Sequence, residues 1–470
     1  MSRIPGGVAA GHPATAAAGL EVLEAGGSAS DSVAAMILAG SVAETIFCGL
    51  NGGGFATVYQ ADTGAVTCLD FFVAVPGLDG TVPGPARNIS ISFGAVPLPY
   101  SMGGPTVAVG GAPWGAAELN RRFGQLSWAQ VVEPARALAA IGAPLSAAHA
   151  GLLPEVAPAM LFGAGVDAYS RPDGAGGRRL LREGELLFHP ELASTLDALA
   201  TGGPAELATG ELGRALVQAV RADGGSLSVQ DMAAYRVREL APLQVPFGPG
   251  TLQVRGNDLD SFAAAAIALD VEAVRRGGAV RVAALVDALR APARRSETTS
   301  VVAVDAAGNA CAATHSLGLG SGVWVGGVHC NSMLGEGELL RAELVPGSRM
   351  PSMMVPCMVT DPAGRLLFAG GAAGGSRIRP ALLQVLAGVL VEGRGIAESV
   401  AAPRLSATEL AVHLEPGFGA EVVSLLESAG EQVVQWDAPR PYFGGVAAAA
   451  ADGLAGDPRR GGTALLLDRP

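Results

Sequence analysis

The 470-residue sequence contains no lysine, so all 31 of its basic residues are arginines. Without lysine the chain cannot form a Schiff base with pyridoxal phosphate, and it lacks the lysine of phosphate-binding loops and of kinases. The 43 acidic residues bring the net charge to −12. That charge argues against a nucleic-acid partner, because binding to phosphates requires a basic surface.

Cysteines, aromatic residues and long apolar runs are also scarce. The five cysteines are odd in number and have no short paired spacing, so they predict neither a disulfide framework nor a zinc site. They are expected to be buried thiols in a reducing compartment. No apolar run reaches the roughly 20 residues needed to span a bilayer, and the first residues do not resemble a signal peptide. These absences predict a cytoplasmic protein with no membrane partner.

The sequence is rich in glycine and in small apolar residues, with 67 glycines and 49% hydrophobic residues. Periodicity and turn signals predict helices and strands in alternating groups, including a β-hairpin that begins at Thr298 and turns at 305–309. This pattern favours a layered α/β architecture with an antiparallel central sheet. The expected helices are 13–25, 30–44, several within 114–200, a short one within 226–237, 262–292, 379–393 and 418–430, and the expected strands are 49–60, 65–75, 322–330, 353–360 and 365–370.

Thr298, at the head of a predicted strand, is a candidate nucleophile. A threonine hydroxyl reacts poorly without a base, but an N-terminal threonine can use its own α-amine, whose pKa is about 8. That chemistry requires cleavage of the Glu297–Thr298 peptide bond. Taken alone, a threonine pair at a strand start is more often structural than catalytic.

Two glycine clusters are candidate backbone-donor sites. Gly374 and Gly375 could let N–H groups approach a developing oxyanion, and each such donor contributes about 3 kcal/mol in comparable sites. The structural alternative is a tight strand-to-helix turn with Ser376 as the N-cap. The cluster at 49–54 could equally be a close-packed turn.

Several blocks, in order along most of the chain, resemble the γ-glutamyltransferase family. They are ATAAAGLEVLEAGGSASDSVAAM, GLNGGGFATVY, SVQDMAAYRV, TTSVVAVDAAGNA, NSMLGEGEL, PSMMVP and GGAAGGSRI. The resemblance implies the four-layer αββα sandwich of N-terminal-nucleophile hydrolases, without cofactor or metal. It also implies self-cleavage between Glu297 and Thr298 into a large subunit, 1–297, and a small subunit, 298–470, that remain associated as one globular unit.

The family's site positions can be carried over residue by residue. The resemblance makes Thr298 the nucleophile, Ser316 the supporting hydroxyl, and Gly374 and Gly375 the oxyanion pair. The positions that would bind the substrate's ammonium and carboxylate groups are Glu336, Asn331 and Ser352, with Pro351 in the place of a second serine.

One position departs from the family pattern. The family's Asp-Phe-Arg motif, whose arginine clamps the substrate α-carboxylate, reads LDFF here, with Phe72 in the arginine's place. A phenyl ring cannot replace a bidentate guanidinium clamp. Glutathione is therefore not the expected substrate. Arg377 and Arg379 are candidates for a replacement anion site, or else are surface arginines.

The expected chemistry is attack by Thr298 Oγ on a carbonyl of a small molecule, with the α-amine as base and an acyl-threonine passed to water or an amine. The first candidate is amide hydrolysis or acyl transfer on a non-glutathione substrate. The second is hydrolysis of a carbon–carbon bond next to a ketone, as in a branch resembling this family that makes alkylproline units of actinomycete antibiotics. The others are ordinary γ-glutamyl transfer and an inactive binding homologue.

Overall fold

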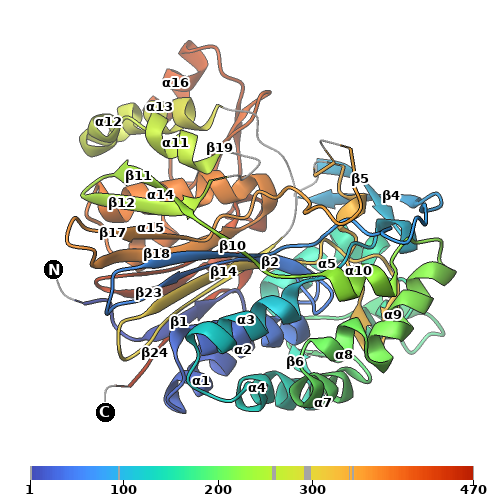
Figure 1. Cartoon of the computed structure of the whole chain (residues 1–470). Coiled ribbons are helices and arrows are strands. Elements are labelled where there is room, and N and C mark those ends of the chain that lie inside the picture. The colour runs from blue at the N-terminus through green and yellow to red at the C-terminus, as the bar shows by residue number, and fades with distance from the viewer. Residues whose placement is uncertain are drawn as a thin grey trace.

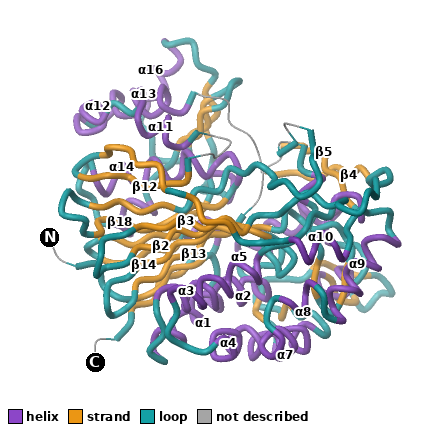
Figure 2. Tube along the Cα trace, viewed as in Figure 1, coloured by secondary structure: helices purple, strands orange, loops and turns teal. Residues whose placement is uncertain are grey.

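Two β-sheets lie face to face between outer layers of helices (Figures 1 and 2). The computed structural model describes residues 3–93, 96–256, 261–290, 298–337, 339–340 and 343–468. The order helix, sheet, sheet, helix is the expected αββα sandwich. Both terminal ends of the described chain lie at the same side of the sandwich in Figure 1.

The first sheet has seven strands, and every neighbouring pair in it is antiparallel. Its members follow β-branched and small apolar stretches of the sequence, as strands with two covered faces do. In spatial order they are β10 (Arg238–Leu240), β3 (Val66–Phe71), β2 (Gly53–Tyr59), β14 (Ala310–Ser316), β13 (Thr299–Val304), β1 (Gly7–Ala10) and β24 (Thr463–Leu466).

The second sheet has six strands, again with only antiparallel neighbours. In spatial order they are β11 (Pro242–Phe247), β12 (Gly250–Arg255), β17 (Cys357–Thr360), β18 (Leu366–Ala373), β22 (Gly445–Ala450) and β23 (Gly453–Gly456).

The two sheets pack through their central strands, with β13 and β14 against β18 and with β13 also against β22. Gly371 of β18 makes this approach possible. A Cβ atom there would lie 2.6 Å from Ser300 Oγ and 2.8 Å from Thr314 Oγ1, so any larger residue would push the sheets apart. The close approach brings the ends of β13 and β18 together.

The outer helices divide between the two faces and a lateral region. Against the first sheet pack α1 (Pro13–Glu24), α2 (Ala29–Ala43) and α3 (Ala112–Phe123), and outside these helices lie α4 (Trp128–Ile141) and α7 (Leu192–Gly202). Against the second sheet pack α11 (Phe262–Ala268), α14 (Ile378–Leu390) and α15 (Ile396–Ala401), and beyond these helices lie α12 (Val271–Arg276), α13 (Gly278–Leu289) and α16 (Ala420–Ser428). The lateral helices are α5 (Ala147–Met160), α6 (Gly165–Tyr169), α8 (Ala205–Ala208), α9 (Glu211–Ala222) and α10 (Val229–Ala234).

Shorter strands and 3₁₀ turns complete the described chain. The small sheets pair β4 (Arg87–Phe93) with β5 (Val96–Met102), β6 (Ala143–Pro144) with β9 (Leu186–Leu187), β7 (Ser170–Pro172) with β8 (Arg178–Leu180), and β15 (Trp324–Val325) with β16 (Val328–His329), and they join β19 (Leu405–Ala407), β20 (Val412–Leu414) and β21 (Val433–Gln435). The 3₁₀ turns are η1 (Gly104–Thr106), η2 (Met333–Gly335), η3 (Gly375–Arg377), η4 (Pro441–Phe443) and η5 (Pro458–Arg460).

Helix α2 is a wholly buried helix that leads directly to the candidate site. All fifteen of its residues are buried, and a capping box between Ser28 and Asp31 fixes its start. Small residues dominate the helix, which lets the sheet and the neighbouring helices approach it closely. Its C-cap residue, Glu44, is consequently held in the interior.

Two of the sequence-based boundaries are wrong. The expected single helix over 262–292 is three helices, because Asp270 caps α12 and two left-handed glycines, Gly277 and Gly278, interrupt the path before α13; residues 291 and 292 lie outside the described residues. The expected strand over 322–330 is the short hairpin β15–β16, because Gly326 and Gly327 also have positive φ angles. The hairpin from Thr298 and all five buried cysteines are confirmed.

No helix in the described part of the chain is long and apolar enough to cross a membrane. Within the same residues, no group of three or more histidine, cysteine or acidic side chains is arranged to hold a metal ion.

Four buried histidines make stability sensitive to acid. Burial lowers the pKa of His149, His315 and His329 to about 3 and that of His189 to about 4. Below pH 6.5 the unfolded chain binds protons that the folded chain does not bind. The free energy of unfolding should therefore fall as the pH drops from 6.5, by up to about 1.4 kcal/mol per histidine per pH unit.

Urea unfolding at pH 7.5, 6.0 and 5.0 measures this effect. This window lies above the usual carboxylate range, so the loss is assigned to histidines. An unfolding midpoint that is the same at pH 7.5 and 5.0 would contradict the prediction.

Candidate active site

Thr298 lies immediately before β13, with a side chain that is only 1% exposed. Its Oγ1 accepts a hydrogen bond of 2.8 Å from the backbone N–H of Gly374. Its carbonyl oxygen accepts one of 3.3 Å from Nη1 of Arg460. The hydroxyl of this residue is thus held from the end of β18, and its carbonyl is held from η5.

The glycine pair lies where β18 ends. Gly374 has φ 117° and Gly375 has φ 56°, so both occupy the left-handed region that favours glycine. The expected N-cap role of Ser376 is wrong, because η3 intervenes and Arg377 takes the N-cap position of α14. Instead, Ser376 Oγ accepts a hydrogen bond of 2.7 Å from Arg377 Nη1.

Ser316 ends β14 beside Thr298. Thr299 pairs with His315 across the sheet, so the next rung of this ladder places Thr298 opposite Ser316. The Ser316 hydroxyl oxygen accepts a hydrogen bond of 2.9 Å from the N–H of Gly318. The sheet register alone therefore brings the two hydroxyl residues together.

Glu336 is connected to this group through Gly318. A Cβ atom at Gly318 would lie 2.7 Å from Glu336 Oε1, 2.7 Å from Ser332 Oγ and 2.8 Å from the Tyr100 hydroxyl. A buried carboxylate and two hydroxyls thus surround this glycine. Tyr100 and Ser332 also hydrogen-bond to each other. Sequence analysis missed both, since Tyr100 comes from the distant β4–β5 hairpin.

Asn331 is turned toward the backbone. Its Nδ2 donates to the carbonyl oxygens of Asn51 at 2.7 Å and Ala108 at 2.8 Å. Its Oδ1 accepts from the N–H groups of Ala108 at 3.0 Å and Met333 at 3.2 Å. These bonds tie the segment before Glu336 to two other loops.

Phe72 is fully buried, with 1% exposure, and stacks on Phe55 at a centroid distance of 5.6 Å. The guanidinium carbon of Arg255 lies 3.8 Å from the centroid of the same Phe55 ring. Arg255 Nε donates to the carbonyl of Met354 at 2.7 Å, and its Nη2 donates to the carbonyl of Ser352. A buried arginine from β12 therefore lies near Phe72 and Ser352, and no sequence motif pointed to it.

Ser352 is also buried, and its hydroxyl oxygen accepts a hydrogen bond of 3.1 Å from the N–H of Met354. Arg377 and Arg379 are buried rather than on the surface, with exposures of 6% and 1%. Arg377 stacks over the ring of Tyr442 at 4.1 Å, whereas Arg379 Nη2 donates to the carbonyl of Leu289 at 3.1 Å. Glu297 lies outside the described residues.

A small cavity beside Thr298 has charged walls that sequence analysis missed. Its lining includes Glu44 from the end of α2 and Arg460 from η5. The two carboxylate oxygens of Glu44 accept hydrogen bonds from the hydroxyls of Thr299, at 2.6 Å, and Thr15, at 2.7 Å. Neither a helix-terminal glutamate nor an arginine near the end of the chain forms a recognisable motif with a threonine at position 298.

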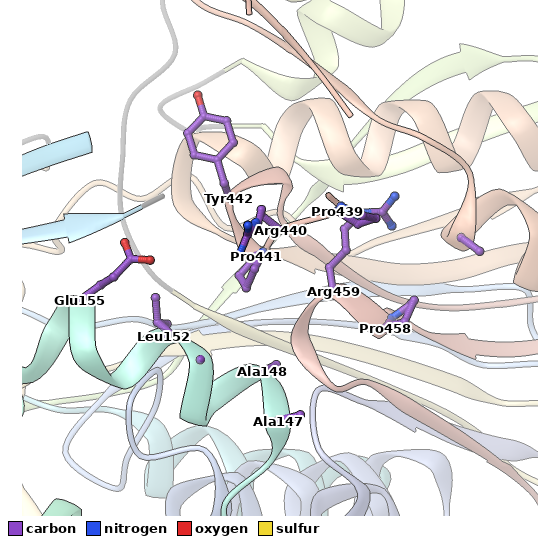
Figure 3. A pocket seen from close by; sticks show the side chains of 12 residues that line it. Ala147, Ala148, Leu152, Glu155, Pro439, Arg440, Pro441, Tyr442, Pro458 and Arg459 are labelled. Carbon is purple, nitrogen blue, oxygen red and sulfur yellow. The ribbon is translucent and has the colours of Figure 1, made fainter. Parts of the chain in front are cut away.

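A larger cavity, of about 450 Å³, lies between α5 and the loops around 439–442 and 458–459. Figure 3 shows Arg440 and Tyr442 on one side of it and Leu152 and Glu155 on the other. Arg460 Nη2 donates to the carbonyl of Pro441 at 3.2 Å. The Arg460 guanidinium thus donates both to Pro441, which lines this cavity, and to the Thr298 carbonyl.

The fold is that of N-terminal-nucleophile hydrolases related to γ-glutamyltranspeptidases and cephalosporin acylases. A cephalosporin acylase from Bacillus halodurans superposes with a TM-score of 0.79 at 21% identity, covering 99% of this chain and 96% of that one. A structure described as LmbA2991T421A gives a TM-score of 0.75 at 20% identity, with coverages of 99% and 98%.

Sequence comparison identifies the family. The gamma-glutamyltranspeptidase family model matches residues 15–272 and 272–467, so the chain belongs to that family. It is 29% identical to the "Acylase ACY 1 proenzyme" of Pseudomonas sp. (strain V22), over 92% of this chain and 87% of the relative. It is 27% identical to the mouse "Glutathione hydrolase 5 proenzyme", with coverages of 90% and 85%. The protein is accordingly a member of a family of self-processing hydrolases and acyltransferases.

Proposed function

We propose that the chain cuts itself between Glu297 and Thr298, and that Thr298 then transfers acyl groups of a small molecule other than glutathione. The observation that carries this proposal is the buried Thr298 hydroxyl, which accepts the N–H of Gly374 at the junction of the two sheets. The names of the acylase and glutathione hydrolase relatives describe those proteins as proenzymes, which supports the processing step.

In the proposed reaction, Thr298 Oγ attacks the substrate carbonyl carbon and its proton passes to the Thr298 α-amine. The N–H groups of Gly374 and Gly375 stabilise the oxyanion that forms on the carbonyl oxygen. Collapse of this intermediate breaks the amide bond, and the α-ammonium returns the proton to the leaving amine. Water or a second amine then attacks the acyl-threonine and restores the hydroxyl.

Glu336 and Ser316 have supporting roles in this proposal. The Glu336 carboxylate, beside Gly318, would bind a cationic group of the substrate. Ser316, opposite Thr298 in the sheet, would hold the loop through the Gly318 N–H. Asn331 would act indirectly, since its amide already binds the backbone of two neighbouring loops.

The substrate is proposed to lack the α-carboxylate of a glutamyl group. Phe72 replaces the family's arginine and packs into a stack with Phe55. Two described guanidinium groups lie nearby, but Arg255 donates to the carbonyls of Met354 and Ser352, and Arg349 pairs with Asp70. Ser352 and Arg377 remain candidates for contacts to other polar groups of the substrate. The absence of the family's carboxylate-binding arginine also fits the second candidate, a hydrolase that cleaves a carbon–carbon bond beside a ketone.

Two measurements test the proposal. Intact-mass analysis and N-terminal sequencing of the purified wild-type protein should find two associated fragments, the smaller beginning at Thr298. A single uncut chain would favour the inactive binding homologue.

A matched pair of anilides then tests the substrate class. γ-Glutamyl-p-nitroanilide and 4-aminobutyryl-p-nitroanilide differ only in the α-carboxylate, and both keep the amine that Glu336 would bind. The proposal expects the second compound to be cleaved at least as fast as the first. Much faster cleavage of the γ-glutamyl compound would support ordinary γ-glutamyl transfer. Cleavage of a β-diketone, with no turnover of either anilide, would support the carbon–carbon hydrolase.

A further inference from the structure

Arg460 lies within hydrogen-bond distance of the candidate nucleophile, and the proposed function gives it no role. Its Nη1 is 3.3 Å from the Thr298 carbonyl oxygen, and its guanidinium carbon is 4.9 Å from the centroid of the Phe47 ring. A Cβ atom at Gly374 would lie 3.0 Å from its Nη2. One positive charge, 5% exposed, thus touches both Thr298 and the surroundings of the oxyanion glycine.

A buried ionic cluster fixes the turn that carries Arg460. Asp457 binds the guanidinium groups of both Arg404 and Arg459, and Arg459 also pairs with Glu415. The two oxygens of Asp457 further accept hydrogen bonds of 3.0 Å from the N–H of Val446 and 3.1 Å from the N–H of Arg459. Because the residue next to Arg460 is so strongly anchored, the position of Arg460 is set before any substrate binds.

The other charged groups around Thr298 are largely occupied by their own partners. Glu44 faces the same small cavity but accepts two hydroxyl hydrogen bonds, and Asp457 is paired with two arginines. Arg377 lies behind Gly374, whose added Cβ would be 3.4 Å from the Arg377 Cβ. His149, next to Arg460, has a pKa lowered to about 3 by burial and by the charges of His12 and Arg460, and is neutral near pH 7.

We infer that Arg460 is a positioning residue that keeps the freed Thr298 α-amine in its neutral, proton-accepting form. This inference rests on the proposed function, because the amine exists only after the Glu297–Thr298 bond is cut. A fixed positive charge near the amine disfavours the charged ammonium and lowers its pKa. The bond to the Thr298 carbonyl also orients the residue, so that amine and hydroxyl stay together.

The absence of lysine makes a direct test possible. After cleavage, the primary amines are the α-amines of the two fragments, so acetic anhydride can titrate them by competitive labelling between pH 5 and 10. Trypsin releases the Thr298 amine in peptide 298–341, since Arg341 is the first basic residue after it. Labelling in that peptide follows the Thr298 amine, and labelling of the large fragment gives an internal reference.

In the wild-type protein the midpoint for Thr298 should lie below about 8, the ordinary value of an α-amine. Arg460→Met should raise it by about one pH unit, and Arg460→Lys, which keeps the charge, should leave it near the wild-type value. The new lysine falls in a different tryptic peptide and does not interfere. A structural role alone would change the amount of folded protein but would not move this midpoint.

The outcomes separate the two proposals. Failure of the wild-type chain to cut would remove the proposed function and the inference together. Cut fragments with a wild-type midpoint at or above that of the large fragment would overturn the inference alone, as would an unchanged midpoint in the Met variant. If the Met variant stays uncut, the wild type and the Lys variant decide: midpoints below that of the large fragment in both support the inference, and a midpoint at or above it in either one overturns the inference.

Discussion

A chain carrying Thr298→Ala is expected to remain in one piece and to lose acyl-transfer activity completely. The alanine has no oxygen to attack either the preceding peptide bond or a substrate carbonyl. The Thr298 side chain is buried, and its hydroxyl oxygen accepts a hydrogen bond from the Gly374 N–H. Its loss should therefore change the chemistry much more than the fold. Gel and intact-mass analysis beside the wild type measures the result.

Thr298→Ser is the matched control for this prediction. Serine keeps the nucleophilic oxygen and the α-amine, so this variant should still yield two fragments, with a slower rate. The circular dichroism spectrum of the alanine variant should match that of the wild type, because the variant lacks only one hydroxyl and one methyl group. Cleavage of the alanine variant at the same bond would show that another group performs the reaction.

The second large effect is expected at the oxyanion glycine. Gly374→Ala should lower the rate of acyl transfer by about 10²–10³, which is the usual loss of one oxyanion donor. Its φ of 117° disfavours any other residue, and an added Cβ would lie 3.0 Å from Arg460 Nη2 and 3.1 Å from Gly444 Cα. Relief of this crowding moves the N–H away from Thr298. Pre-steady-state rates of p-nitroaniline release from the better of the two anilides provide the measurement.

Gly430→Ala separates the loss of the donor from backbone strain. Gly430 has φ 86°, and a Cβ there would meet no atom within 4 Å. It therefore has a similar conformational penalty at a site far from the chemistry. The control should retain normal rates with a slightly lower unfolding midpoint. Equal loss of rate in both variants would contradict a specific role of Gly374.

Local signals in the sequence were enough to predict the layered fold. The hairpin from Thr298 follows from β-branched residues on both sides of an Asp-Ala-Ala-Gly-Asn turn, and the structure pairs its two strands antiparallel across that turn. Family resemblance then supplied the sandwich, which the structure shows. Helix 262–292 could not be divided correctly because alanine-rich segments look alike until glycine φ angles are known.

The candidate site was only partly accessible to the same reasoning. Thr298 and Gly374 belong to blocks that resemble the family, and Ser316 follows one of these blocks by six residues. Arg460, by contrast, reaches Thr298 from 162 residues away, and Glu44 reaches Thr299 from 255 residues away. Such contacts depend on how sheets and helices stack, and no local pattern encodes them. The sequence also left open whether Arg377 and Arg379 lie on the surface, and the structure shows that both are buried.

The strand order has a consequence for the life of the protein after processing. In the first sheet, β14 and β13 lie between β2 and β1, and β1 in turn lies between β13 and β24. Strands from before and after Thr298 therefore pair with one another in one sheet. A cut before Thr298 would leave all of these strand pairings intact. Once unfolded, however, two separate chains must find each other in solution, so refolding becomes dependent on concentration and competes with aggregation. Processing would thus make unfolding largely irreversible. The lifetime of the mature protein would then depend on its unfolding rate and not on a folding equilibrium.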